Sequence, residues 1–190
     1  MPIDGFLCPG HVSVVIGSRA YEPVVQQFGK PCVVAGFEPA GVLTAMLRLV
    51  EQLDAGRAAV ENAYGVAVAD EGNAAARLCI DEVFEPADAV WRAMGTLPHS
   101  GLVLREGYRR FDAVARFDVT IGPDYEPPGC RCGEVIQGKV DPFECALFGR
   151  RCTPNTPIGP CMVSSEGTCA AWYKYRRASE SARPEELTRS

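Results

Sequence analysis

The sequence has few of the features that mark several common protein classes. Only two histidines, His11 and His99, occur among 190 residues, and neither follows the cysteines near the C-terminal end. No apolar run reaches the roughly 18 residues that span a bilayer, and the first residues lack the basic segment typical of a targeting signal. These features predict a cytoplasmic protein that is not embedded in a membrane.

Basic residues are also scarce relative to acidic ones. The formal net charge is -5 at pH 7, which argues against nucleic acid as the main partner. With 47% hydrophobic and 23% charged residues, the chain has the balance of a globular protein that can bury a core without disulfides. In the cytoplasm, clustered cysteines are more often metal-binding or catalytic than structural bridges.

Cysteine is abundant between Gly129 and Cys169. Six of the nine cysteines lie there: Cys130, Cys132, Cys145, Cys152, Cys161 and Cys169. The segment has a Cys-x-Cys but no Cys-x2-Cys pair of the usual structural zinc sites, so zinc would need a four-thiolate site. A [4Fe–4S] cluster needs four thiolates, and the surplus two would then form a redox pair or be incidental. Counting does not decide which four are ligands.

The rest of the chain alternates apolar strands and helices. The patterns predict strands at 11–17, 31–37 and 100–104, helices at 21–29, 40–56 and 73–83, and a surface helix or turn at 105–113. In the helix at 40–56, one face is predicted to point toward the core, with Val42, Met46, Leu49, Val50 and Leu53. A strand, a glycine-containing turn and a long helix together predict a Rossmann-like α/β domain.

The composition changes at Ile121. Residues 121–130 contain three prolines and two glycines, and the apolar periodicity fades beyond them. The sequence therefore predicts an α/β domain at 1–122, a small cysteine-rich iron–sulfur region with little regular structure at 123–177, and a disordered tail at 178–190. A bound metal would supply folding energy that the cysteine-rich region lacks.

Several motifs, in order, resemble those of the HypD family of hydrogenase maturation factors. They are FLCPGHVSVVIG, VVAGFEP, CRCGEV, CALFGRRCTP and PIGPCMVSSEGTCAAWYKY, and they extend from about Gly5 to Arg177. The resemblance implies a scaffold that helps to build the Fe(CN)2CO unit of [NiFe]-hydrogenases with HypC-like and HypE-like partners, with iron as the substrate metal. It also implies two α/β domains and a C-terminal region similar to that of ferredoxin–thioredoxin reductase.

The resemblance assigns roles to the six clustered cysteines. The family's C-x14-C-x6-C-x16-C pattern falls on Cys130, Cys145, Cys152 and Cys169, which are then the expected ligands of a [4Fe–4S] cluster. Cys132 and Cys161 match the family's redox-active pair. The expected chemistry is an electron relay in which the dithiol stores two electrons beside a cluster that carries one at a time.

The family is nearly twice as long as this sequence. Its first half carries a Cys-Gly-Thr-His motif and a Gly-Pro-Gly-Cys-Pro-Val-Cys motif, and neither occurs here. The sequence therefore resembles the C-terminal half of the family, as a fragment, a split gene product or a truncated gene model. A separate N-terminal HypD half is accordingly an expected partner.

Two polar residues outside the cysteine-rich segment are candidate site residues. In the family, His11 lies near the cleft where iron is assembled, so it is expected to order that cleft, transfer a proton or share a metal with Cys8. The alternative is a structural histidine beside a buried cysteine. Glu38 follows a strand and precedes a helix, where it either binds a ligand or caps the helix. Cys32 and Cys79 are predicted to lie in the core.

The sequence is also compatible with two other functions. A general thiol–disulfide reductase would use Cys132 and Cys161 on protein substrates and would not depend on HypC. A structural or interaction module would use the metal only to keep the C-terminal region folded, and it would tolerate substitution of both residues. The preferred interpretation is a maturation scaffold with redox chemistry, whether or not it counts as an enzyme.

Overall fold

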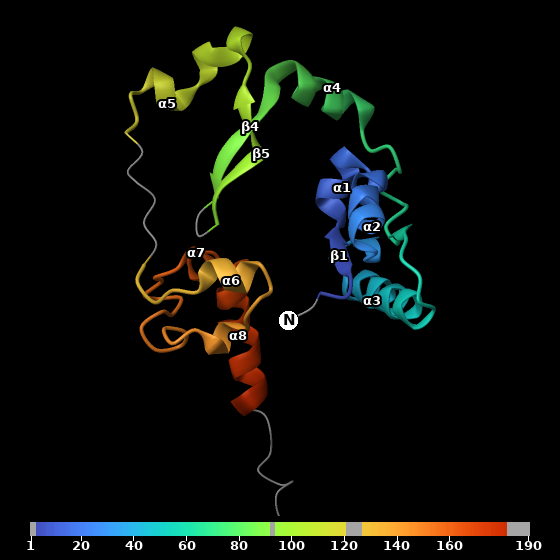
Figure 1. Ribbon diagram of the computed structural model, residues 1–190, viewed down its shortest axis with the longest axis vertical. Helices are drawn as coiled ribbons and strands as arrows, with labels where there is room; N and C mark the ends of the chain where they lie inside the picture. Colours follow the sequence, from blue (N-terminus) through green and yellow to red (C-terminus); the bar gives the residue numbers. More distant parts are fainter. Residues whose placement is uncertain (1–2, 92–93, 121–126, 182–190) are drawn as a thin grey trace, which may run out of the picture. The chain divides into compact units, whose positions relative to one another are not determined.

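The computed structural model describes residues 3–91, 94–120 and 127–181, with side chains as far as Tyr175 (Figure 1). These residues form two compact units. One comprises Ile3–Glu85 with Val103–Asp112, and the other comprises the described parts of Pro86–Leu102 and Ala113–Ser190. Within the described ranges, no helix is both long enough and apolar enough to cross a membrane.

The first unit is built on a three-stranded parallel sheet. Its strands are β1 (Phe6–Pro9), β2 (Cys32–Ala35) and β3 (Val60–Asn62), in the order β1-β2-β3, and their first residues lie opposite one another. Every residue of β2 is buried, because a central parallel strand is covered on both faces. The strand predicted at 31–37 is therefore confirmed, and its unbroken apolar sequence follows from its central place.

The segment predicted as a strand at 11–17 is a helix, α1 (Gly10–Ile16), so that prediction was wrong. The strand lies just before it, in β1. Only Gly10 and Ser13 are buried in α1, and residues three apart share one face of a helix. The helix thus packs through its smallest side chains. The strand preference of valine and isoleucine amounts to less than about 1 kcal/mol per residue, which tertiary packing overrides.

Two short helices follow α1. They are η1 (Ser18–Tyr21), a 3-10 helix, and α2 (Glu22–Phe28). The helix α2 ends at Gly29, which has a φ of +60° and occupies the left-handed region that glycine adopts without strain. The predicted helix at 21–29 and its glycine stop are both confirmed.

The long helix predicted at 40–56 is confirmed as α3 (Pro39–Asp54), which packs on β2 and β1. Its buried residues are Ala45 and Gln52. Three of the five apolar residues predicted to face the core are exposed: Met46, Val50 and Leu53. The prediction of the core-facing side was wrong because α3 is apolar over a wider arc than the sheet covers.

The remaining elements before the cysteine-rich region comprise α4 (Ala74–Val83), β4 (Phe84–Trp91), β5 (Gly95–Leu104), η2 (Glu106–Phe111) and α5 (Ala113–Arg116). The predicted helix at 73–83 is confirmed, and the Asn73 side chain caps it by accepting a hydrogen bond from the Ala76 N–H at 3.0 Å. The predicted strand at 100–104 is confirmed, but it is longer and pairs with β4, which the sequence did not predict.

The cysteine-rich region consists of short helices and turns. They are α6 (Cys132–Ile136), η3 (Pro142–Glu144), α7 (Pro160–Val163) and α8 (Thr168–Ser181). The last helix reaches Ser181 and so enters the segment predicted to be disordered, while residues 182–190 and the predicted boundary at 122–123 lie outside the described residues. The predicted class, a mixed α/β fold with a cysteine-rich C-terminal region, is what the structure shows.

Candidate functional site

The six cysteines of the C-terminal region gather around one small core. Cys132 begins α6, Cys145 follows η3, Cys161 lies in α7, Cys169 lies in α8, and Cys130 and Cys152 lie in connecting loops. Cys130 is half-buried and the other five are buried. Five of them pack with the apolar residues Val135, Met162 and Ala170, and Cys145 adjoins this core through its contact with the Gly129 carbonyl, next to Cys130. Segments almost 40 residues apart in sequence thus bring their thiols to one place.

Aromatic packing holds the loop that carries Cys145 and Cys152 against α8. The Phe143 ring lies 5.2 Å from the Phe148 ring and 5.1 Å from the Trp172 ring, measured between centroids. The Phe148 and Tyr173 rings are 6.2 Å apart. Such edge-on contacts stabilise by about 1 kcal/mol each beyond the area they bury. This packing was not predicted, although four aromatic residues lie near the cysteines of a chain that has few aromatic residues.

Cys161 contacts two other cysteines. Its Sγ lies 3.0 Å from the Cys169 Sγ, and its backbone N–H donates a hydrogen bond to the Cys132 Sγ at 3.3 Å. The two residues expected to form a redox pair are therefore neighbours, and one of them also touches an expected cluster ligand.

The backbone provides further polar contacts to the sulfurs. The Ile158 N–H donates to the Cys152 Sγ at 3.4 Å, and the Cys145 Sγ donates to the Gly129 carbonyl at 3.9 Å. A Cβ on Gly159 would meet the Cys130 Sγ at 2.5 Å, so only glycine fits beside this thiol. An N–H that donates to sulfur tunes the electron density on a thiolate when a metal is bound.

Burial helps to raise the pKa of three thiols of this region, Cys130, Cys132 and Cys161. Desolvation raises the pKa of Cys132 to about 12, and its contact with Cys161 adds to the effect. The hydrogen bond with Cys169, followed by burial, raises the pKa of Cys161 still further. Burial also raises the pKa of Cys130. Of these three, only Cys130 is an expected ligand, so metal binding there would release its proton and depend on pH.

The four expected ligands, Cys130, Cys145, Cys152 and Cys169, all belong to this gathering of thiols. Among the residues that the structure describes, no group of three or more His, Cys, Asp or Glu side chains converges tightly enough to hold a metal ion. Four thiolates on one zinc ion would lie within about 4 Å of one another. A cluster is larger than one ion and holds its ligand sulfurs further apart. All nine cysteines are free thiols.

His11 and Glu38 lie in the first unit, at the carboxyl edge of the parallel sheet. His11 is exposed on α1, and its ring lies 5.1 Å from the Phe37 ring. Glu38 is exposed at the N-cap position of α3, but its side chain makes no capping hydrogen bond. The Tyr64 ring, which the sequence analysis missed, packs over the backbone of Gly10 and Gly36 at this edge. The edge is a usual place for binding groups in α/β proteins.

The isolated cysteines of the first unit divide into two kinds. Cys8 and Cys32 are buried side by side, and burial followed by the Cys32 charge raises the pKa of Cys8 to about 12. The core position predicted for Cys32 is confirmed. Cys79 is exposed on α4, so its predicted core position was wrong: α4 has no buried residue despite its apolar sequence.

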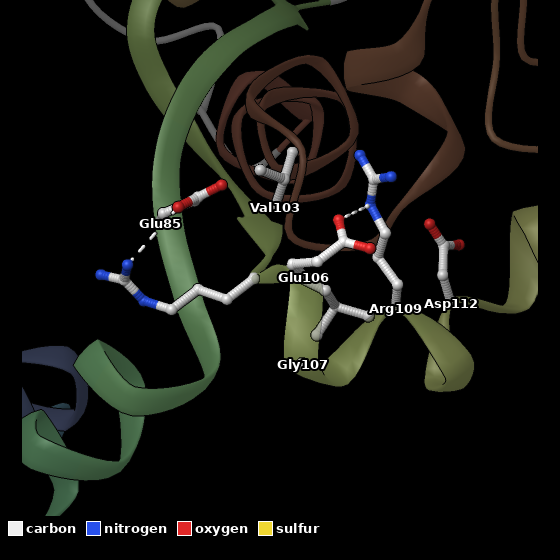
Figure 2. A pocket seen from close by; sticks show the side chains of 8 residues that line it. Glu85, Val103, Glu106, Gly107, Arg109 and Asp112 are labelled. Atoms are coloured by element: carbon white, nitrogen blue, oxygen red, sulfur yellow. Dashed lines mark hydrogen bonds and ion pairs between the residues drawn. The ribbon is translucent and has the colours of Figure 1, made fainter.

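An open hollow of ≈ 540 Å³ lies elsewhere in the first unit (Figure 2). It is lined by Glu85, Val103, Leu104, Arg105, Glu106, Gly107, Arg109 and Asp112. Arg105 pairs with Glu85 at 3.4 Å, and Arg109 pairs with Glu106 at 3.1 Å. Its main charges thus neutralise one another, and none of the predicted site residues lines it.

Comparison with known proteins gives a consistent result. Residues 1–176 match the family described as "HypD: Hydrogenase formation hypA family". The chain is 49% identical over 178 residues to "Hydrogenase maturation factor HypD1" of Bradyrhizobium diazoefficiens, covering 93% of this chain and 47% of that protein. It is 48% identical over 178 residues to "Hydrogenase maturation factor HypD" of Cupriavidus necator, with coverage of 93% and 47%.

The homologue from Escherichia coli, also called "Hydrogenase maturation factor HypD", is 47% identical over 181 residues, which are 95% of this chain and 48% of that protein. The similarity therefore extends over nearly all of the present sequence. The chain spans about half the length of the curated relatives it matches.

Proposed function

Because the chain belongs to the HypD family of hydrogenase formation proteins, we propose that it acts in the maturation of [NiFe]-hydrogenases. In this proposal it is an iron–sulfur scaffold in the cytoplasm, with a Rossmann-like first domain, which assists the assembly of the Fe(CN)2CO unit. Its partners would be HypC-like and HypE-like proteins and a polypeptide equivalent to the N-terminal half of the family. The iron under assembly is substrate.

The observation that carries the proposal is the gathering of six thiols in one small core. Soft thiolates are the ligands that iron–sulfur clusters require, and a buried anionic sulfur is stable only beside a cation. The donor set therefore fits a [4Fe–4S] cluster held by Cys130, Cys145, Cys152 and Cys169. When bound, such a cluster supplies electrons one at a time.

The chemistry of the two remaining thiols follows from their contact. Oxidation of Cys132 and Cys161 to a disulfide forms one S–S bond and releases two protons and two electrons. In the proposed role, the electrons go to the iron under assembly and its incoming ligands. The backbone N–H of Cys161, which donates to the Cys132 Sγ at 3.3 Å, would stabilise the Cys132 thiolate that begins this step.

Burial distinguishes this role from that of a general disulfide reductase. Cys132 is 3% exposed and Cys161 is 6% exposed, and a protein disulfide must reach an accessible sulfur for exchange. The structural-module alternative predicts instead a site that does not change redox state. Titration of the pair with a thiol reagent under graded reducing potentials separates the structural module from the two redox functions. Turnover of a generic disulfide substrate then identifies a general reductase.

The test of the proposal is anaerobic purification of the full chain, with iron, sulfide and zinc measured alongside the visible spectrum. About four irons and four sulfides per chain are expected, as for one [4Fe–4S] cluster. Cys130→Ala should lower the iron content, whereas Cys132→Ala should leave it unchanged. One zinc without sulfide, or loss of iron in Cys132→Ala alone, would sink the ligand assignment.

A further inference from the structure

A continuous apolar surface runs along the side of α3 that faces away from the sheet. We call it the α3 stripe: Leu43, Met46, Leu47, Val50 and Leu53, whose exposed fractions are 45% to 66%. Positions three and four apart lie next to one another on a helix, so the five side chains form one stripe. Single exposed apolar residues are ordinary, but a stripe of five along one helix marks an interaction site.

The α3 stripe lies toward the β1 side of the sheet. The Arg48 guanidinium marks the β3 side, because it lies 3.5 Å from the Asn62 carbonyl. Leu49 marks the β1 side, since its Cδ2 would lie 3.1 Å from a Cβ on Gly5, the residue before β1. At 100° per residue, rotation around the helix from Arg48 through Leu49 leads next to Leu53 and Met46. The stripe is thus continuous with the β1 side of the unit.

β1 is itself an edge strand with exposed apolar residues. No other strand among the described residues pairs with its outer side, and Phe6 and Leu7 are 38% and 45% exposed. Parallel sheets are normally covered on both faces, and proteins usually cover or charge an apolar edge. Here the strand edge and the neighbouring helix face both lack cover among the described residues, as they would if another α/β segment packed there.

We propose that the α3 stripe and the β1 edge bind a polypeptide equivalent to the half of the HypD relatives that this chain does not span. Alignment covers only 47% to 48% of those relatives, so they carry about as much further polypeptide as the chain matches. An apolar surface without charged residues at its centre is typical of permanent interfaces. This inference deepens the proposed function by locating one partner, and it rests on the family assignment and not on the iron chemistry.

The test is co-expression of the tagged full chain with the unspanned half of the Cupriavidus necator relative. A stoichiometric complex is expected, and Leu47→Glu should weaken it at least about tenfold, as a charge does at the centre of an interface. The matched control is Val66→Glu, because Val66 is 94% exposed and lies outside the surface. It should leave the affinity within about twofold.

Other occupants of the surface give different results, and each overturns the proposal. A homodimer that Leu47→Glu dissociates would identify a second copy as the occupant. If no complex forms and Leu47→Glu lowers the melting temperature of the chain alone, the occupant would be the chain's own second unit. A complex that is equally strong with Leu47→Glu would place the interface elsewhere.

A second measurement covers the case in which the unspanned half does not fold by itself. In a fusion of the unspanned half with the full chain, Leu47→Glu should lower the melting temperature of the fusion protein. The same substitution in the chain alone should leave its melting temperature unchanged. An equal effect in both proteins would overturn the proposal. Repeating the binding assay with Cys130→Ala separates the proposed docking surface from the proposed iron–sulfur function, because the complex should persist when the iron content falls.

Discussion

Cys8 shows how burial controls a single thiol in the first unit. Burial and the neighbouring Cys32 raise its pKa from 9.0 to about 12. A group whose folded-state pKa is raised adds stability below its unfolded pKa, and that stability is lost as the pH rises through the folded pKa. We expect the free energy of unfolding to fall between about pH 9 and pH 12, and to fall less in Cys8→Ala.

The measurement is urea denaturation of both proteins at pH values from 7 to about 11, monitored by far-UV circular dichroism because both tryptophans, Trp91 and Trp172, lie outside the first unit. The difference between the two proteins removes the contributions of tyrosines and lysines, which titrate in the same range. Parallel curves for wild type and Cys8→Ala would contradict the argument.

Cys161 has two potential disulfide partners. Its Sγ lies 3.0 Å from the Cys169 Sγ, and its N–H donates to the Cys132 Sγ. Oxidised glutathione, itself reduced to two thiols, should therefore link Cys161 to Cys132 in some molecules of the metal-free chain and to Cys169 in others. Mass mapping of peptides identifies both links, and Cys169→Ser should leave only the first. A single Cys132–Cys169 link would contradict this geometry.

At this scale the sequence predicted which cysteines belong together but not how they touch. The order and spacing of the motifs were enough to single out six thiols and two candidate roles. The contact between Cys161 and Cys169 depends on the tight turn between α7 and α8, where the Gly167 N–H donates to the Ser164 carbonyl at 3.0 Å. The spacing of the cysteines in the sequence does not predict that turn. The exposure of Cys79 was missed because it depends on what packs against α4.

The helix α1 depends on a glycine at its first position. A Cβ on Gly10 would lie 2.6 Å from both the Ala35 carbonyl and the Tyr64 ring. Gly10→Ala should therefore lower the free energy of unfolding by about 1–3 kcal/mol through overpacking. Gly65→Ala is the control, since nothing lies within 4 Å of its Cβ position, and it should change stability by no more than about 0.5 kcal/mol.

Chemical denaturation of the two variants compares these effects directly. If Gly10→Ala were as stable as Gly65→Ala, then α1 would be free to move away from the sheet. The close contact of Gly10 with Ala35 and Tyr64 would then not contribute to the free energy of unfolding. The same contact explains why the sequence misplaced this strand. A run of valines and isoleucine predicts a strand, whereas the small residues Gly10 and Ser13, three apart, are what seat the helix.

The paired strands β4 and β5 were only partly predicted from the sequence. Their exposed residues give neither an alternating pattern nor a continuous apolar run, so the sequence predicted only residues 100–104. Backbone pairing forms this sheet, with added contacts such as the hydrogen bond from Trp91 Nε1 to the Ser100 Oγ at 2.7 Å. Strands that pair mainly through their backbones have no side-chain pattern from which they can be predicted. Helices with glycine or asparagine at their ends, such as α2 and α4, were predicted correctly because their signals are local.

At the scale of the whole molecule, each compact unit has its own core. The cysteine-rich core consists largely of thiols, so metal should contribute much of its stability, whereas the sheet of the first unit needs none. Removing iron with a chelator should make the amides of α6, α7 and α8 exchange with deuterium at least about tenfold faster. The amides of β2 should keep their protection.

Hydrogen exchange with mass spectrometry measures both units in one sample. Cys132→Ala is the control, because it leaves the four expected ligands in place and should respond to the chelator as wild type does. Equal loosening of both units would show that they fold as one. Unchanged exchange in α6, α7 and α8 would show that the cysteine-rich region needs no metal to fold.

The general plan of the molecule followed from composition. An aliphatic first part and a cysteine-rich second part were both expected, and both are present. The return of Val103–Asp112 to the first unit, after the chain has left that unit at Glu85, was not predicted. This segment is held in the first unit by contacts between residues far apart in sequence. One is the hydrogen bond that the Arg105 N–H donates to the Val83 carbonyl at 2.9 Å.

Cys130 is the only one of the six clustered cysteines that solvent reaches appreciably. Oxidation of a thiol to sulfenic acid requires an accessible sulfur as well as thiolate character, so we expect peroxide to attack the metal-free centre first at this residue. Because Cys130 is also an expected ligand, one modification there is enough to prevent loading while the other five thiols remain intact. The lifetime of the metal-free centre in air is therefore expected to depend mainly on this side chain.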